Sequence, residues 1–284
     1  MWLEFAKMHG LGNDFMVVDL VTQQCEITAE LARGWGDRRT GVGFDQLLLV
    51  EPPSDPDADF RFRIFNTDGS EAKQCGNGAR CVAWYVAERR LSPKPELVLQ
   101  TLGGHIVTRR AGEDTVEVDM GEPRIDAARI PFDAHAEGVV PVAGTPGTYE
   151  LMVEGHRCRF TTVSMGNPHA VLFVESVADA PVDILGPALV AHRMFPEGAN
   201  IGFCEVVDAS FARLRVYERG AGETRACGSG ACAAVAAGRL LDKLGPRVKV
   251  SLPGGKVRIG WQGPGSAIKM TGPATLVFEG RIPA

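Results

Sequence analysis

Short apolar or alternating runs dominate the chain, and clusters of glycine, proline, aspartate and asparagine separate them. Runs of this length and composition predict strands, and the polar clusters predict turns. The segment SDPDAD (54–59) predicts one such turn. The predicted strands are FMVVDL, QLLLVE, FRFRIFN, ELVLQT, HIVTRR, TVEVDM, RCRFTTVSM, AVLFVES, FARLRVYER, RVKVSL, KVRIGW and ATLVFEG.

Four segments have helical character instead: 28–38, 76–90, 185–195 and 228–244. The last ends before Gly245-Pro246, a sequence that stops helices. Its residues GSGACAAVAAGRLL are small and apolar on nearly every face, and the second helix starts similarly. A helix that is apolar all round is normally buried. We therefore predict an α+β fold, in which a strongly curved, mostly antiparallel sheet wraps around a central helix in each half.

A repeat divides the chain. IFNTDGSEAKQCGNGA (64–79) matches VYERGAGETRACGSGA (216–231) at a constant offset of 152. Upstream, GLGNDFMVV (10–18) resembles MGNPHAVLF (165–173), with Asn13 opposite Asn167. Gln46 and Asn200 are likewise matched, and both pairs are offset by 154. Ordered landmarks of this kind predict two pseudo-symmetric copies of one fold, and two copies are too few for a solenoid.

The two halves can be given approximate bounds. We expect an N-terminal half over 1–125, to which the C-terminal strand 274–284 returns, and a C-terminal half over 126–273. A stretch rich in proline and charge, 121–135, is the expected linker. We expect an active site in the cleft between the halves. Duplication with one inert copy would also explain the repeat, but each half retains a cysteine, a glutamate and an upstream Gly-Asn.

Composition narrows the function classes. The 284 residues include 45% apolar and 23% charged residues, which is ordinary for a soluble globular protein. A net charge of −5 disfavours nonspecific binding to nucleic acid. The first ten residues lack the apolar stretch of a signal peptide, and no apolar run is long enough to span a bilayer. We therefore expect a cytoplasmic protein without a membrane or nucleic-acid partner.

The seven cysteines are scattered and odd in number, which disfavours a disulfide framework. Cysteine spacing and the absence of a nearby histidine also disfavour zinc, so no metal is expected. Glycine-rich nucleotide fingerprints are absent. Cys75 and Cys227 differ from the other cysteines because glycine follows each one and a predicted helix begins there.

A cysteine just ahead of a helix lies near unpaired backbone N–H groups, which favour its thiolate and bind anions. Glycines let a ligand approach those N–H groups closely. Two such loops could hold one carboxylate with a sulfur on each side. A hydrogen-bearing carbon between the sulfurs could lose a proton to one and regain one from the other, which inverts its configuration. The N–H groups would stabilise the developing charge, so no cofactor is needed in principle.

Four ordered motifs resemble the diaminopimelate epimerase family: MHGLGNDF (8–15), FNTDGSEAKQCGNGARCVA (65–83), MGNPHAV (165–171) and YERGAGETRACGSGACAA (217–234). The resemblance implies a cofactor-independent isomerase that interconverts LL- and meso-diaminopimelate by two-base proton transfer. It also implies a role in bacterial lysine and peptidoglycan precursor synthesis and a homodimer.

The resemblance also assigns site residues. Cys75 and Cys227 match the catalytic cysteines, and His169 matches a histidine that either assists proton transfer or has a structural role. Three groups match substrate contacts. Those at the reacting carboxylate are Gly76, Asn77, Gly228 and Ser229; those near the reacting centre and its ammonium are Asn13, Gln46 and Glu218; those at the distal end are Asn66, Asn167, Asn200 and Arg219.

Three other functions compete with this hypothesis. One is a sister isomerase acting on proline, hydroxyproline or another small acid, for which Arg219 and three distal asparagines would be surplus. The second is a non-catalytic amino-acid binding protein, which the retention of both cysteines disfavours. The third is a thiol redox or zinc protein. Glu71 and Glu223, also paired by the repeat, are expected to brace the cysteine loops rather than touch substrate.

Overall fold

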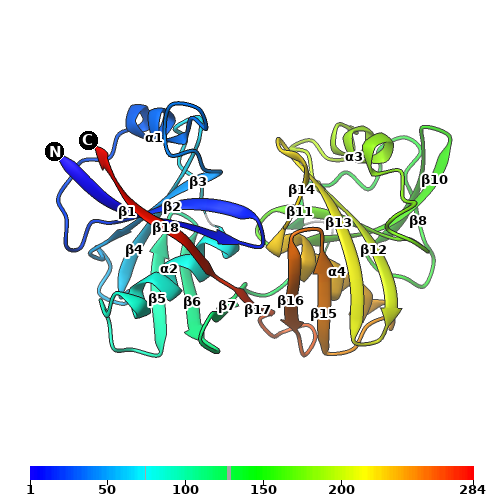
Figure 1. Cartoon of the computed structure of the whole chain (residues 1–284). Helices are drawn as coiled ribbons and strands as arrows, with labels where there is room; N and C mark the ends of the chain where they lie inside the picture. The colour runs from blue at the N-terminus through cyan, green and yellow to red at the C-terminus, as the bar shows by residue number, and fades with distance from the viewer. Residues whose placement is uncertain (74, 127–128) are drawn as a thin grey trace. The chain divides into compact units, whose positions relative to one another are not determined.

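The computed structural model describes residues 1–73, 75–126 and 129–284 (Figure 1). It divides into two compact units: unit 1 contains residues 1–119 and 271–284, and unit 2 contains residues 120–270. The C-terminal strand β18 (Thr275–Pro283) pairs antiparallel with β1 (Trp2–Gly10) of unit 1, from Trp2 opposite Pro283 to His9 opposite Thr275. Residues 127–128 of the expected linker lie outside the described residues.

In its described residues, unit 1 contains strands β1 to β7, β18 and two helices. Its remaining strands are β2 (Asn13–Asp19), β3 (Gln46–Glu51), β4 (Phe60–Asn66), β5 (Glu96–Thr101), β6 (Gly104–Arg110) and β7 (Thr115–Asp119); its helices are α1 (Ala29–Gly36) and α2 (Gly76–Glu88). The pairs β2–β3 and β4–β5 are parallel. The pairs β1–β2, β3–β4, β5–β6 and β6–β7 are antiparallel.

Unit 2 repeats this topology. Its elements are β8 (Val140–Pro141), β9 (Thr148–Val153), β10 (His156–Ser164), β11 (Pro168–Phe173), α3 (Val182–Val190), β12 (Asn200–Asp208), β13 (Phe211–Glu218), β14 (Gly222–Thr224), α4 (Gly228–Leu240), β15 (Arg247–Leu252) and β16 (Gly255–Gly260), and β17 (Lys269–Pro273) crosses the boundary between the units. The pairs β11–β12 and β13–β15 are parallel, like β2–β3 and β4–β5 of unit 1.

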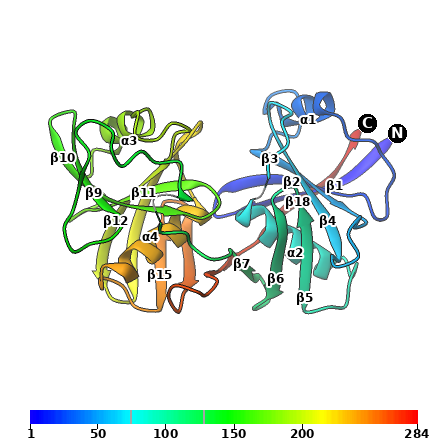
Figure 2. The same cartoon turned by 180° about the vertical axis from the view of Figure 1, so that it is seen from behind.

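Each unit wraps its strands around one buried helix. Helix α2 packs against β1, β6 and β7, and helix α4 packs against β10, β11 and β12 (Figures 1 and 2). Small residues permit the close approach: a Cβ added to Gly78 of α2 would lie 3.2 Å from side-chain atoms of Leu48 and Phe62. The predicted α+β fold with a central helix in each half is confirmed.

The four predicted helices exist, but their ends differ. Helices α1, α2 and α4 end at 36, 88 and 240, earlier than the predicted 38, 90 and 244, and α3 covers 182–190 instead of 185–195. Asp37 is extended, with φ −64° and ψ 122°, and Arg90 has φ 56°. Backbone in these conformations cannot continue an α-helix. The hydrophobic pattern of the sequence does not show where such a local change of backbone conformation ends a helix.

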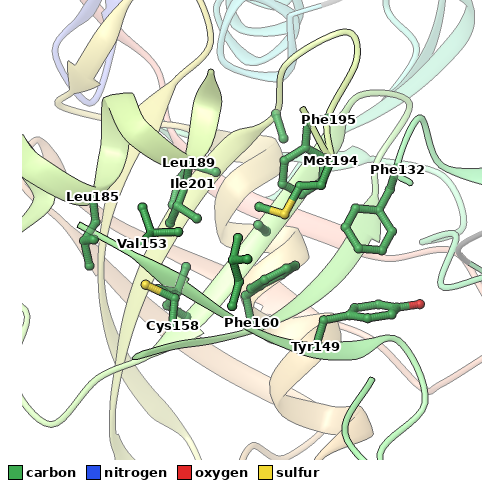
Figure 3. Close-up of a cluster of buried hydrophobic side chains, with 14 of the residues drawn as sticks. Phe132, Tyr149, Val153, Cys158, Phe160, Leu185, Leu189, Met194, Phe195 and Ile201 are labelled. Atoms are coloured by element: carbon green, nitrogen blue, oxygen red, sulfur yellow. The ribbon is translucent and has the colours of Figure 1, made fainter. Parts of the chain in front are cut away.

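Part of the expected linker belongs to the core of unit 2. Ile130 and Phe132 are buried in one hydrophobic cluster, and Figure 3 shows Phe132 within it. The Phe132 ring lies 4.6 Å from Tyr149 and 5.2 Å from Phe195, measured between ring centroids. Burial of these apolar side chains outweighs the polar and proline-rich composition around them. These two residues of the expected linker therefore contribute to the core of unit 2.

Candidate functional site

Both repeated cysteines stand at the N-cap of a central helix. Cys75 precedes α2 and Cys227 precedes α4, and both have extended backbone. The Gly78 N–H donates to Cys75 Sγ at 3.3 Å. Cys75 is half-buried, whereas Cys227 is 4% exposed. Each sulfur thus lies at a helix N-terminus, where the first backbone N–H groups and the helix dipole favour an anion.

Cys227 has a low-polarity, negatively charged environment. Burial, and secondly the Glu218 carboxylate, raise the pKa of this thiol well above its usual value. The Ser229 hydroxyl lies 3.6 Å from Cys227 Sγ and opposes part of this effect. Glu218 accepts a hydrogen bond from the Thr224 hydroxyl. The sequence repeat does not point to Thr224, because the equivalent position in unit 1 is Ala72.

An arginine braces each cysteine loop. Arg63 donates to both carboxylate oxygens of Glu71, at 2.9 and 3.0 Å. Arg215 donates in the same bidentate way to Glu223, at 2.6 and 2.9 Å. Bidentate pairs of this kind fix geometry as well as adding energy. Both glutamates therefore brace the segments that lead to the cysteines, as their place in the repeat suggests.

The polar residues expected in unit 1 come together as hydrogen-bonded amides. Asn77, at the start of α2, donates from Nδ2 to Asn13 Oδ1 at 3.2 Å. Gln46 donates from Nε2 to Asn66 Oδ1 at 2.9 Å, because the register of β3 and β4 places the two residues opposite each other. Asn13 begins β2 and Gln46 begins β3, while Asn66 ends β4. The unit thus brings four expected side chains together as two hydrogen-bonded pairs, Asn13 with Asn77 and Gln46 with Asn66.

Asn13 is also bound to a charged network that our sequence reasoning missed. Its Nδ2 donates to Asp45 Oδ2 at 2.9 Å, and Arg38 donates to Asp45 Oδ1 at 2.8 Å. Arg38 and Lys7 both pair with Asp14, at 2.7 and 2.6 Å. Burial raises the pKa of Asp14, but hydrogen bonds from Arg38 and Lys7 outweigh it and hold the pKa well below its usual range. Asp45 immediately precedes Gln46, and this position next to an expected site residue is the signal in the sequence that could have pointed to Asp45.

The expected residues of unit 2 form a second set. The Asn200 side chain accepts from the Arg219 backbone N–H at 2.9 Å, and the Arg219 guanidinium donates to the Glu197 carbonyl. Asn167 Nδ2 donates to Ser229 Oγ at 3.4 Å. The first contact joins the start of β12 to the residue that follows β13, and the second joins the residue before β11 to the start of α4.

His169 is the most buried polar residue of this set, with 1% of its surface exposed. Its Nε2 lies 3.2 Å from Asn167 Oδ1. Burial, with a smaller effect of Arg219, lowers the pKa of His169 to about 3. The imidazole is therefore neutral at physiological pH and carries one N–H.

Two further observations concern metals and membranes. Among the described residues, no three histidine, cysteine, aspartate or glutamate side chains gather in a group that could hold a metal ion. Within the same described ranges, no helix is both long enough and apolar enough to cross a bilayer.

Comparison with solved structures shows the fold. A hydroxyproline epimerase from Agrobacterium vitis matches 99% of this chain and 92% of its own, with a TM-score of 0.67 and 16% identity. A PhzF-family phenazine biosynthesis protein from Enterococcus faecalis matches all of both chains, with a TM-score of 0.69 and 13% identity. The chain therefore has the two-unit α+β fold of these proteins.

Sequence comparison then gives the family. The model of the diaminopimelate epimerase family matches residues 5–125 and 161–277. A diaminopimelate epimerase from Stutzerimonas stutzeri (strain A1501) is 53% identical over 282 residues, which cover 99% of each chain. The chain belongs to the diaminopimelate epimerase family, and the predicted family assignment is confirmed.

Proposed function

We propose that this chain is a cofactor-independent isomerase that interconverts LL- and meso-diaminopimelate. The observation that carries the proposal is the pair of cysteines, each capping the central helix of its unit, in a chain of this family. Helix N-termini bind carboxylates, and thiols near them can exchange protons at neutral pH. Family membership supports diaminopimelate over proline, hydroxyproline or another small acid as the substrate. It also supports an isomerase over an amino-acid binding protein or a thiol redox protein.

The proposed chemistry uses the cysteines as acid and base. One thiolate takes the α-proton of the substrate and becomes a thiol, while the electron pair of the C–H bond delocalises into the α-carboxylate. The other thiol donates its proton to the opposite face of the carbon and becomes a thiolate. Cys75 and Cys227 exchange roles when the substrate has the opposite configuration. Backbone N–H groups at Gly76, Asn77, Gly228 and Ser229 stabilise the charge on the carboxylate.

We assign the remaining expected residues to recognition of the substrate. Glu218, Asn13 and Gln46 lie near the reacting centre and its ammonium. Asn66, Asn167, Asn200 and Arg219 hold the distal ammonium and carboxylate. Support comes from the hydrogen bonds that organise these side chains within each unit. An epimerase must accept both configurations at one carbon, and rigid distal contacts allow this.

The biological setting is part of the proposal. We infer that the protein works as a cytoplasmic homodimer in bacterial lysine and peptidoglycan precursor synthesis. The resemblance to the family supports this setting. No cofactor, metal, membrane or nucleic acid enters the proposed reaction.

Proton NMR in D₂O tests the proposal. Reduced protein and LL-diaminopimelate, with no cofactor added, should give meso product with deuterium at the inverted α-carbon, while early remaining substrate keeps its hydrogen. Early exchange of substrate and product at similar rates would instead indicate one exchanging base. Absence of any exchange would refute the substrate assignment, and the same assay with proline and hydroxyproline would then test a sister isomerase.

Cysteine variants test the assigned pair. Cys75→Ala and Cys227→Ala should each lower epimerisation by at least about 100-fold, since a positioned acid or base contributes about 10² to 10⁴. Cys25→Ser, at a half-buried cysteine outside both loops, is the matched control and should retain activity. Retention of more than a tenth of the activity by either alanine variant would contradict the two-base assignment.

A further inference from the structure

The two units hold equivalent asparagines in opposite orientations. Asn13 and Asn167 are related by the offset of 154, and each contacts the residue two places after its cysteine, Asn77 or Ser229. Asn13 turns its carbonyl oxygen toward Asn77, whereas Asn167 turns its NH₂ group toward Ser229. The same side chain therefore presents an acceptor beside one cysteine loop and a donor beside the other.

Asp45 determines the orientation in unit 1. A carboxylate can only accept hydrogen bonds, so the group of Asn13 that faces Asp45 must be the NH₂ group. Asp45 itself is held by three donors: Asn13 Nδ2 at 2.9 Å, the Asp14 backbone N–H at 3.1 Å and Arg38 Nη2 at 2.8 Å. With its nitrogen bound in this way, Asn13 directs Oδ1 toward Asn77.

His169 determines the orientation in unit 2. Its Nε2 lies 3.2 Å from Asn167 Oδ1, and the tautomer of the neutral imidazole that carries its proton on Nε2 donates to this oxygen. Arg219 is the charged group that acts on this ring, and it disfavours the imidazolium form. With its oxygen bound to His169, Asn167 directs Nδ2 toward Ser229.

Neither partner occurs in the other unit. The position equivalent to Asp45 is Ala199, and the position equivalent to His169 is Phe15. The strand registers preserve the equivalence, because Phe15 lies opposite Gln46 on the parallel pair β2–β3 and His169 lies opposite Asn200 on β11–β12. Backbone symmetry is thus kept while the polarity of the amide is reversed.

We propose that Asp45 and His169 are positioning residues that set the polarity of two substrate-contacting asparagines. Asn13 presents an oxygen, which suits an ammonium group, and Asn167 presents an N–H, which suits a carboxylate. This inference rests on the proposed function, in which one amino-acid substrate carries both kinds of group. It gives His169 an orienting role instead of a proton-transfer role.

Isosteric exchanges test the polarity. Asn167→Asp replaces the donor by a second oxygen, so kcat/KM should fall by at least about 100-fold, mainly through KM. The double variant Asn13→Asp with Asp45→Asn leaves the net charge unchanged and keeps an oxygen directed away from residue 45. It should lose less kcat/KM than Asn13→Asp alone, in which two carboxylates face each other.

The outcomes separate the possibilities. Equal losses in Asn167→Asp and the double variant would overturn the proposal, because amide polarity would then have no effect. Wild-type protein is assayed first by deuterium incorporation in D₂O. A wild type that does not epimerise diaminopimelate refutes the proposed function, whereas an active wild type with equal losses in the variants refutes this inference alone.

Substitutions of His169 separate orientation from proton transfer. His169→Gln keeps an N–H that can donate to Asn167, so it should retain activity far better than His169→Leu, whose KM should rise. Equal loss in the two variants would contradict the orienting role. Nitrogen-15 NMR of histidine-labelled wild-type protein gives a readout independent of activity and of variant folding. It should show His169 neutral and protonated on Nε2 between pH 5 and 9; a proton on Nδ1 would overturn the proposal.

Discussion

Lys7 is a buried cation of unit 1, and its replacement by methionine should measurably destabilise the protein. The Lys7 side chain is 9% exposed, and its ammonium lies 2.6 Å from Asp14 Oδ2 and also donates to the Gly43 carbonyl. Methionine replaces the apolar stem, so the substitution removes mainly the charge and its hydrogen bonds. It leaves Asp14, whose side chain is 19% exposed, with Arg38 as its cationic partner.

The expected cost follows from these contacts. Removing one partner of a fully buried ion pair costs about 3–5 kcal/mol, but Arg38 still donates to Asp14 at 2.7 and 3.0 Å. Loss of the charged hydrogen bond between Lys7 and Asp14 therefore lowers the free energy of unfolding by about 2 kcal/mol, and leaving the Gly43 carbonyl without this donor lowers it by about 1 kcal/mol more. A loss of about 3 kcal/mol lowers the melting temperature by roughly 5 °C for a protein of this size.

Urea unfolding followed by tryptophan fluorescence measures this change, with Arg38→Met as the matched control. Arg38 pairs with the same carboxylate, but 57% of its side chain is exposed, so its loss should cost about 1 kcal/mol or less. A loss in Lys7→Met below about 1 kcal/mol, or no larger than that in Arg38→Met, would refute the reasoning.

The same pair predicts a pH dependence. The folded-state pKa of Asp14 lies below its unfolded value of about 3.9, so the stabilisation is complete above that pH. It is lost as the pH falls through the lowered folded-state value. The difference in unfolding free energy between wild type and Lys7→Met should therefore be constant from pH 6 to 8 and narrow below about pH 4. A difference that widens in acid would contradict the assigned sign.

Two other expectations concern packing and thiol reactivity. Gly186→Ala should lower the free energy of chemical unfolding by about 1–3 kcal/mol, because the added Cβ would lie 2.5 Å from Tyr217 Cγ. Gly34→Ala is the control: its added Cβ would meet no neighbouring atom within 4 Å, so it should stabilise the protein by about 0.5–1 kcal/mol. Equal effects of the two substitutions would contradict the packing argument. Iodoacetamide at pH 8 should modify Cys75 faster than Cys227, because Cys227 is 4% exposed and burial raises its pKa. Peptide mass spectrometry measures the two labelling rates. Faster labelling of Cys227 would contradict the described environments.

Local sequence patterns were sufficient to predict much of the fold. The offset of 152 between the cysteine motifs predicted two copies, and the small apolar residues after Cys75 and Cys227 predicted buried helices. Both features are local, since strand alternation and helix burial follow from residue type and spacing alone. Helix ends were less well predicted, because single residues such as Asp37 and Arg90 end them through their backbone conformation.

The amide orientations required tertiary structure. In the sequence Asn13 and Asn167 are equivalent members of a repeat, and nothing near them indicates that their amides point in opposite directions. The orientation depends on Asp45, which is 32 residues from Asn13, and on the burial of His169 beside Asn167. Which residues meet across parallel strands is set by register, and register follows from packing of the whole sheet.

By itself, the sequence determined the two-copy α+β architecture, the two cysteines at helix starts and the family, because these depend on composition, spacing and short motifs. Only the tertiary structure decided what surrounds each motif: the arginine braces on Glu71 and Glu223, the network around Asp45 and the neutral state of His169. The physical reason is that hydrogen-bond direction and charge state depend on distant partners and on burial, which short-range sequence patterns do not encode.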